Sequence, residues 1–200
     1  MRERSILALI ALGSLVMDGR SSPSDSRAGT AVRMDVEQMV QVADLVLEAR
    51  VLGARSLETA QGQIETELEL DVDRTLYGPD VPHRFVRWPG GVLADGRGML
   101  LPGLALPRPG EDLLLLLSPP SSTGLRLPVG LSQGHFRLLM DRAGRRVAVR
   151  SQGRLTLVSQ GSGALEEASD HFVIDYAELR ARIESALALR RGFGAIEESK

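Results

Sequence analysis

One stretch of the sequence has the residue types and spacing of a catalytic nucleophile. Residues 130–134 read Gly-Leu-Ser-Gln-Gly, which matches the pattern G-x-S-x-G, and His135 follows directly. In serine hydrolases this pattern forms a sharp turn between a strand and a helix, and the turn exposes the serine hydroxyl for attack on an ester. Ser132 is therefore the candidate nucleophile of a secreted serine hydrolase.

The residues that follow Ser132 favour a turn over a nucleophile. Apolar and polar residues alternate over residues 135–140, which is the period of a strand and not of a helix. His171 lies further along the chain as a possible partner, but no alternation of strands and helices surrounds it. We therefore expect residues 130–134 to form a tight connection between two strands, and we predict no catalytic residue.

The chain offers few residues for other chemistry. Its three histidines, His83, His135 and His171, do not have the H-x-x-x-H or H-x-H spacing of a metal site. It has no cysteine, which excludes thiol catalysis, disulfides and cysteine-ligated metals. The sequence also has no P-loop and no dinucleotide-binding motif. We therefore predict no metal and no cofactor, and we expect the histidines to be exposed to solvent.

The charge of the chain argues against a nucleic-acid partner. The formal net charge is −2, and the arginines are scattered among acidic residues instead of forming one basic patch. Aromatic residues make up 4% of the sequence, too few for the stacking platform that binds single strands. We therefore expect no nucleic acid to bind.

Residues 1–31 have the pattern of a signal peptide and its cleavage region. Arg2 and Arg4 precede an apolar run over residues 6–17, and a stretch rich in small and polar residues follows. The apolar run is shorter than the roughly 20 residues that cross a bilayer. Cleavage after Ala31 fits the preference for small residues. We expect an exported protein, periplasmic or extracellular, that does not span the membrane after cleavage.

The clearest strand pattern lies over residues 64–73, where five carboxylates alternate with apolar residues. Side chains on one strand face lie about 6.6 Å apart, so these carboxylates do not converge on a calcium ion. We expect them to form a solvated face that pairs with Arg84 or Arg87 on a neighbouring strand.

The remaining patterns predict a mainly β protein with a helix near each end. The uninterrupted leucines at 113–117 predict a strand that is buried on both faces or lies at the centre of the sheet. Asp35 with Gln38, and Asp175 with Glu178, have the spacing of capping boxes at the start of a helix. These boxes predict a short N-terminal helix and a C-terminal amphipathic helix.

These elements predict one domain with flanking segments. Residues 32–160 are expected to form an OB-like or meander β-barrel of about six to eight short strands. Residues 161–174 are interpreted as a linker, residues 175–191 as the C-terminal helix, and residues 192–200 as a frayed tail. The glycines at 192 and 194 are expected to end the helix.

The connection over residues 89–110 is long and rich in proline and glycine. Connections of this length without regular structure are often functional. Its middle is apolar, so we expect it either to pack back on the barrel or to contact another molecule. Its rigid prolines are expected to pre-organise it for a partner. We predict that a partner binds six residues here: Trp88, Met99, Leu100, Leu101, Pro102 and Leu104.

Four segments carry a resemblance to known proteins: DVEQMVQVADLVLEARVL, IETELELDVDRTLYG, GEDLLLLL and VGLSQGHFRL. They resemble segments of a group of uncharacterised exported bacterial proteins, over residues 35–149. The same outline is similar, more loosely, to netrin-like and metalloproteinase-inhibitor modules, which are OB-type β-barrels. Those inhibitors chelate zinc through an N-terminal cysteine, which this chain does not have. The resemblance therefore implies a barrel but no activity and no catalytic residues.

The sequence leaves three functional hypotheses. The first is an exported, non-enzymatic β-barrel module that binds a protein or a cell-envelope component through residues 89–110. The second is a secreted serine hydrolase that uses Ser132. The third is an accessory or inhibitor protein of an exported protease, which the inhibitor-like layout suggests.

Overall fold

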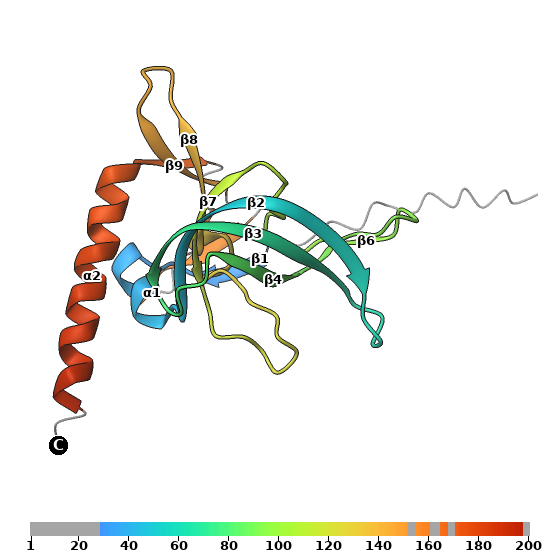
Figure 1. Cartoon of the computed structure of the whole chain (residues 1–200), viewed down its shortest axis with the longest axis horizontal. Helices are drawn as coiled ribbons and strands as arrows, with labels where there is room; N and C mark the ends of the chain where they lie inside the picture. The colour runs from blue at the N-terminus through green and yellow to red at the C-terminus, as the bar shows by residue number, and fades with distance from the viewer. Residues whose placement is uncertain (1–28, 152–154, 161–164, 168–170, 198–200) are drawn as a thin grey trace, which may run out of the picture.

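The computed structural model describes residues 29–151, 155–160, 165–167 and 171–197 (Figure 1). Its main element is a seven-stranded sheet with the strand order β12-β9-β8-β7-β2-β3-β4, and all its neighbours are antiparallel. A three-stranded sheet, β1-β10-β11, and a two-stranded hairpin, β5-β6, accompany it. The expectation of a mainly β protein is confirmed. The expected signal peptide lies almost wholly outside the described residues.

The element bounds follow the chain in order. The strands of the main sheet are β2 (Leu45–Glu58), β3 (Ile64–Tyr77), β4 (His83–Pro89), β7 (Asp112–Leu117), β8 (His135–Met140), β9 (Arg146–Ser151) and β12 (His171–Asp175). The smaller strands are β1 (Gly29–Val32), β5 (Gly91–Val92), β6 (Gly98–Met99), β10 (Leu155–Val158) and β11 (Leu165–Glu167). The helices are α1 (Val36–Val42), the 3-10 helix η1 (Leu131–Gly134) and α2 (Tyr176–Glu197).

The first strands of the main sheet form a Greek key. Strands β2, β3 and β4 follow one another as a meander, and β7 returns to pair with the free side of β2. This is the spatial order 4-1-2-3 of the Greek key. The connection between β4 and β7 must therefore cross from one edge of the meander to the other, which is a topological reason for its length. At 14 residues each, β2 and β3 are longer than the short strands expected.

The two faces of this sheet bury two separate clusters, and β7 divides its side chains between them. Leu114 and Leu116 pack in a cluster that also contains residues of both helices. Leu113, Leu115 and Leu117 pack in a second cluster on the opposite side, which we call the inner cluster. All five leucines have no exposed surface, so the prediction of a strand buried on both faces is confirmed. Among the described residues, no helix contributes a side chain to the inner cluster. It is enclosed by the curved strands themselves and by two side chains of the long connection, Leu104 and Leu106.

The helices cover one face of the sheet, and hydrogen bonds connect α2 to the end of α1. Asp35 and Gln38 form the expected capping box of α1, with hydrogen bonds of 2.7 and 2.9 Å. Arg190 of α2 donates to the carbonyl oxygens of Val40 and Ala43 at 2.8 and 2.6 Å. These carbonyls lie at the C-terminal end of α1, where carbonyl oxygens have no N–H partner within the helix. A buried stripe on α2 packs on the same cluster as α1.

Two expected boundaries are wrong. Residues 161–174 are not a linker, because they contain β11 and also most of β12, which pairs with β9 at the edge of the main sheet. The helix does not end at 191, and residues 192–197 continue it through both glycines. Gly192 is exposed, and a glycine in an exposed helix costs only about 1 kcal/mol relative to alanine. No helix in the described part of the chain is long and apolar enough to cross a bilayer.

The expected cleavage position after Ala31 falls within an ordered element. Residues Gly29–Val32 form β1, which pairs in parallel with β10. Cleavage at that position would therefore remove three of the four residues of β1 and leave Val32 at the new terminus.

Candidate functional site

The segment with the nucleophile pattern does not have the geometry of a nucleophile elbow. Residues Leu131–Gly134 form one 3-10 turn, and β8 follows it, so the prediction of a strand after the serine is confirmed. Ser132 has no exposed surface. Within the described part of the chain its hydroxyl has no hydrogen-bond partner, and in particular none to His135. In this structure Ser132 therefore lacks both features of an activated nucleophile, an exposed hydroxyl and a hydrogen-bonded base.

Gln133 is the residue of this segment that makes the polar contacts. Its side-chain oxygen accepts a hydrogen bond from the backbone N–H of Met34 at 2.9 Å. Its side-chain nitrogen donates to the carbonyl oxygens of Val32 and Gly130 at 2.7 and 3.1 Å. Gln133 therefore satisfies backbone groups on both sides of Arg33, where the chain leaves β1. The sequence analysis treated Gln133 only as a polar turn residue and missed this role.

Two neighbours of Gln133 have unusual backbone requirements. Gly130 and Leu131 both have positive φ, at 64° and 61°. The left-handed region costs a residue with a side chain about 1–2 kcal/mol, so the segment holds Leu131 under strain. A Cβ on Gly134 would lie 2.7 Å from the carbonyl oxygen of Leu116 and 2.9 Å from the backbone of Val129. The second glycine of the pattern is therefore required by the close approach of neighbouring backbone.

Trp88 lies inside the protein and cannot belong to a partner-binding surface. Its side chain has no exposed area and packs in the cluster with Val86 and the leucines of β7. The prediction for Trp88 is wrong because β4 continues to Pro89, and alternation along that strand places Val86 and Trp88 on the same inner face.

His135 is also buried, contrary to the expectation of exposed histidines. Its ring contacts Trp88 edge-on, with 5.5 Å between ring centroids. Its cross-strand neighbour is Leu115, so β8 directs His135 toward the inner cluster. Burial, with a smaller contribution from the charge of Arg137, lowers the pKa of His135 to about 4. His135 is therefore a neutral core residue at physiological pH. His83, by contrast, is exposed and lies 3.0 Å from Glu69.

The acidic face of β3 is solvated only in part. Asp71 and Asp73 are exposed, as expected. Glu65 is buried and forms an ion pair with Arg87 of β4, as the sequence analysis allowed for this strand pair. Arg84 instead donates to the carbonyl oxygen of Pro79 at 2.9 Å.

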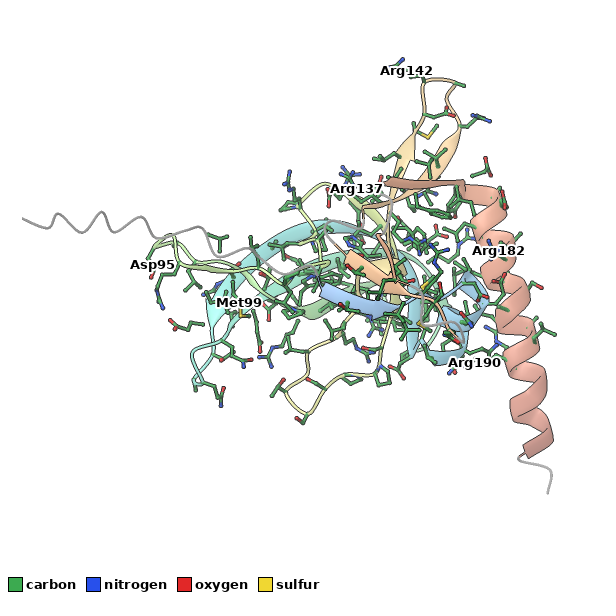
Figure 2. The ribbon with its side chains drawn as sticks, turned by 180° about the vertical axis from the view of Figure 1, so that it is seen from behind. Asp95, Met99, Arg137, Arg142, Arg182 and Arg190 are labelled. Atoms are coloured by element: carbon green, nitrogen blue, oxygen red, sulfur yellow. The ribbon has the colours of Figure 1, made fainter. Side chains whose placement is uncertain are left out.

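The long connection contains a hairpin that the sequence analysis missed. Strands β5 and β6 pair across a turn, and Gly96 in that turn has φ of 87°. The dipeptide Asp95-Gly96 is a recognised hairpin signal, which the sequence contained. The hairpin lies beside the outer halves of β2 and β3. We call this part of the molecule, residues 52–66 and 90–101, the arm. In Figure 2, Asp95 and Met99 mark its end, on the side opposite α2.

Arg97 fixes this hairpin to the outer end of β2. Its guanidinium donates to both carboxylate oxygens of Glu58, at 3.0 and 2.7 Å, and to Asp95 at 2.9 Å. The hydrogen bonds with Arg97 lower the pKa of the carboxyl groups of Glu58 and Asp95. Thr66 donates to the carbonyl oxygen of Gly90 at 2.7 Å. The hairpin is therefore held at both its base and its turn.

The predicted partner-binding residues of the connection differ in exposure. The side chain of Leu100 is 78% exposed, and Pro102 is also exposed. Met99 and Leu101 are half-buried. Leu104 packs against the inner cluster and serves the core. Val92 of β5, which the sequence analysis did not select, is 56% exposed. It lies on the same hairpin as Met99.

Neither a metal site nor a known relative indicates a function. Within residues 29–151 and the described segments after them, no three histidine or carboxylate side chains gather as metal ligands. No protein-family model matches the chain, and no curated protein matches it significantly. The function proposed below therefore depends on the geometry of the chain.

Proposed function

We propose that the protein is an exported, non-enzymatic β-barrel module that binds another protein through the arm. The Greek-key order of β7, β2, β3 and β4 supports the barrel, because OB-type barrels are built on a Greek key. The signal-peptide pattern of residues 1–31 supports export.

The observation that carries the proposal is the exposure of Val92 and Leu100 on a hairpin that is held in place. Single exposed apolar side chains are common on protein surfaces and have no special meaning. Here, however, Arg97 and Thr66 fix the backbone that carries them. A surface that is already ordered loses less conformational entropy when a partner binds. An apolar contact on a fixed hairpin therefore favours association with an apolar patch of another protein.

Site-specific photo-crosslinking in cells that make the protein tests this proposal. A photoreactive phenylalanine analogue at position 100 is expected to give a discrete protein adduct of defined mass. The same analogue at Met140, which is 65% exposed on the β8–β9 hairpin, is the matched control and is expected to give none. Adducts that are equal at both positions, or absent at both, would contradict the proposal.

A second pair of variants tests whether the apolar side chains provide the affinity. The double variant Val92→Ser/Leu100→Ser is expected to reduce co-purification of the crosslinked protein by at least about tenfold, since each buried apolar side chain contributes about 1.5 kcal/mol or more. The control, Met140→Ser/Leu189→Ser, changes two other exposed apolar residues and is expected to have no effect. Crosslinks to lipid or wall material in place of protein would transfer the proposal to an envelope component. A protease as the adduct would support the accessory-protein hypothesis.

A further inference from the structure

The main sheet ends in two edge strands, β4 and β12, and the chain itself protects the edge at β4. Arg87 of β4 forms a bridge with Leu125, and its carbonyl oxygen accepts a hydrogen bond of 2.9 Å from the N–H of Arg126. Pro89 ends the strand and has no N–H to donate to a further strand. Prolines, charged side chains and covering loops are the usual means of keeping other chains from an edge strand.

The edge at β12 has none of these protections in the part of the chain that the structure describes. Its sequence is His-Phe-Val-Ile-Asp, without proline, lysine or arginine. One side of the strand pairs with β9 over all five residues. Within the described ranges, no strand or loop backbone pairs with its other side. An edge of this kind presents N–H and C=O groups that can pair with another strand.

Apolar surface accompanies this edge. Val173, the middle residue of β12, is 58% exposed. It lies beside Val149 of β9, and in the next row of the same face Val147 lies beside Leu139, which is also exposed. The helices cover the opposite face, where Ile174 packs in the cluster that contains residues of both helices. The edge therefore combines unpaired backbone with an apolar side chain at its centre, which suits a second strand better than water.

We propose that β12 pairs with β12 of a second copy of this chain, antiparallel, about a two-fold axis through Val173. Two-fold symmetry is the commonest symmetry of soluble oligomers, and it requires a surface that is complementary to itself. A strand with a neutral, apolar centre meets this requirement, because the centre of the strand then lies opposite its own copy.

The sequence of β12 fits this register over its whole length. Val173 lies opposite Val173 of the second copy, and Phe172 lies opposite Ile174, so apolar residues meet apolar residues. Asp175 lies opposite His171, and histidines can donate hydrogen bonds to carboxylates. A two-fold axis through Asp175 would instead place two carboxylates opposite each other, which destabilises strand pairing. Charge and polarity therefore select the axis through Val173.

The proposed dimer joins the two main sheets into one and leaves the arms free. β12 leads directly into α2 (Figure 1), and the arm lies on the side of the molecule opposite α2 (Figure 2). Each copy therefore keeps its arm away from the shared edge. The pairing uses no residue of the arm, so it does not depend on the proposed function.

A single introduced cysteine tests the position of the axis, because the chain has no cysteine of its own. Val173→Cys is expected to form a disulfide-linked dimer under mild oxidation, since directly opposite residues of antiparallel strands have Cα atoms about 4.5–5.5 Å apart, within disulfide range. The matched control is Phe85→Cys, because Phe85 is also 58% exposed but lies on β4 at the other edge. It is expected to stay monomeric. Equal yields of dimer at both positions, or no dimer with Val173→Cys, would overturn the proposal.

Sedimentation velocity measures the pairing without a crosslink. A five-residue strand pair is a small interface, so wild type is expected to change from monomer to dimer between about 1 and 100 µM. Val173→Lys and Val173→Glu each place like charges at the axis and are each expected to remain monomeric. An equimolar mixture of the two is expected to recover the dimer, which would also show that both variants are folded.

Two results of this measurement would contradict the pairing. Wild type that stays monomeric over the whole range would overturn the proposal and leave the edge to a strand of another protein. A mixture that is no more dimeric than either variant alone would show that Val173 does not lie at a two-fold axis.

Discussion

Residues 130–135 and the β5–β6 hairpin are both short connecting segments beside the main sheet, yet they direct their side chains in opposite ways. The first is polar, and Ser132, Gln133 and His135 are all buried. The second carries apolar side chains, and Val92 and the adjoining Leu100 are mostly exposed. In each segment, the place of the segment in the fold determines whether its side chains are buried. The polarity of those side chains does not determine it.

The physical reason differs between the two segments. Gln133 is buried because backbone groups near the exit of β1 need partners, and its amide supplies both a donor and an acceptor. The hairpin is exposed because it extends beyond the sheet along the arm, where charged and polar contacts hold it. A buried polar segment that satisfies backbone is structural, whereas an apolar segment held at the surface is available to a partner.

The largest effect is expected from truncating Trp88, which contacts His135 of the first segment and precedes the β5–β6 hairpin in the chain. Trp88→Ala should lower the free energy of unfolding by about 3–5 kcal/mol, because it leaves a large cavity in the inner cluster. Leu100→Ala, directly after β6, should change the free energy of unfolding by less than about 0.5 kcal/mol. Urea denaturation measures both. Similar effects at the two positions would mean that Trp88 is not a core residue.

Acid should destabilise the protein through His135. Its pKa is lowered from the ordinary 6.5 to about 4 in the folded state, so between these values the unfolded chain binds a proton that the folded chain does not. Stability is therefore highest above pH 6.5 and is lost as the pH falls toward 4. The loss is about 3 kcal/mol, since a tenfold difference in proton affinity is worth about 1.4 kcal/mol.

The variant His135→Phe isolates this contribution, because other carboxyl groups also titrate in acid. It keeps an aromatic edge against Trp88 but has no proton to bind. The difference in unfolding free energy between wild type and His135→Phe should change across pH 4–6.5 and stay constant above it. A difference that does not depend on pH would show that His135 is exposed to solvent or protonated in the fold.

Removing the amide of Gln133 should cost less than either change in the core. Gln133→Met keeps the length of the side chain but leaves backbone groups of Val32 and Met34 without their partner. The expected loss is about 2 kcal/mol, by urea denaturation. Gln160→Met is the control, because Gln160 is exposed and should change stability by less than about 0.5 kcal/mol. Equal losses of unfolding free energy in Gln133→Met and Gln160→Met would contradict the role of Gln133 in satisfying these backbone groups.

Among the buried residues, the smallest effect is expected at the residue that most resembles a catalyst. Ser132→Ala removes a buried hydroxyl that has no partner within the described part of the chain, so stability should change by less than about 1 kcal/mol. Hydrolysis of generic ester substrates should be equal in wild type and variant. An ester activity that Ser132→Ala abolishes would restore the hydrolase hypothesis.

The sequence was most informative where one periodic pattern dominated. The leucines at 113–117, the capping box at Asp35 and the strand after residue 134 all have the predicted structure. Trp88 was misjudged because it borders the long connection, although Val86 and Trp88 share the alternation of a strand and therefore the same face. The strands within residues 161–174 are short and lie among polar residues, so their periodicity was weak.

The site could be predicted less well than the fold, because its parts meet only in three dimensions. Gln133 contacts residues about 100 positions away, at Val32 and Met34. The ion pair of Arg97 with Glu58 joins the turn of the β5–β6 hairpin to the end of β2, 39 positions away. The ion pair of Arg182 with Glu37 joins α2 to α1 across 145 positions. None of these pairings has a local periodic signal, whereas the Asp95-Gly96 turn did and could have identified the hairpin.

The opposite exposure of the two segments can be measured directly, because the chain has no cysteine of its own. Two single variants, Ser132→Cys and Leu100→Cys, are labelled with a thiol reagent in the native state and again in denaturant. We predict that Leu100→Cys reacts at nearly the same rate in both states. Ser132→Cys should be protected at least about 100-fold in the native state and should react freely only after unfolding. Native labelling at equal rates would contradict the buried position of Ser132 and, with it, the distinction between a structural polar segment and an exposed binding arm.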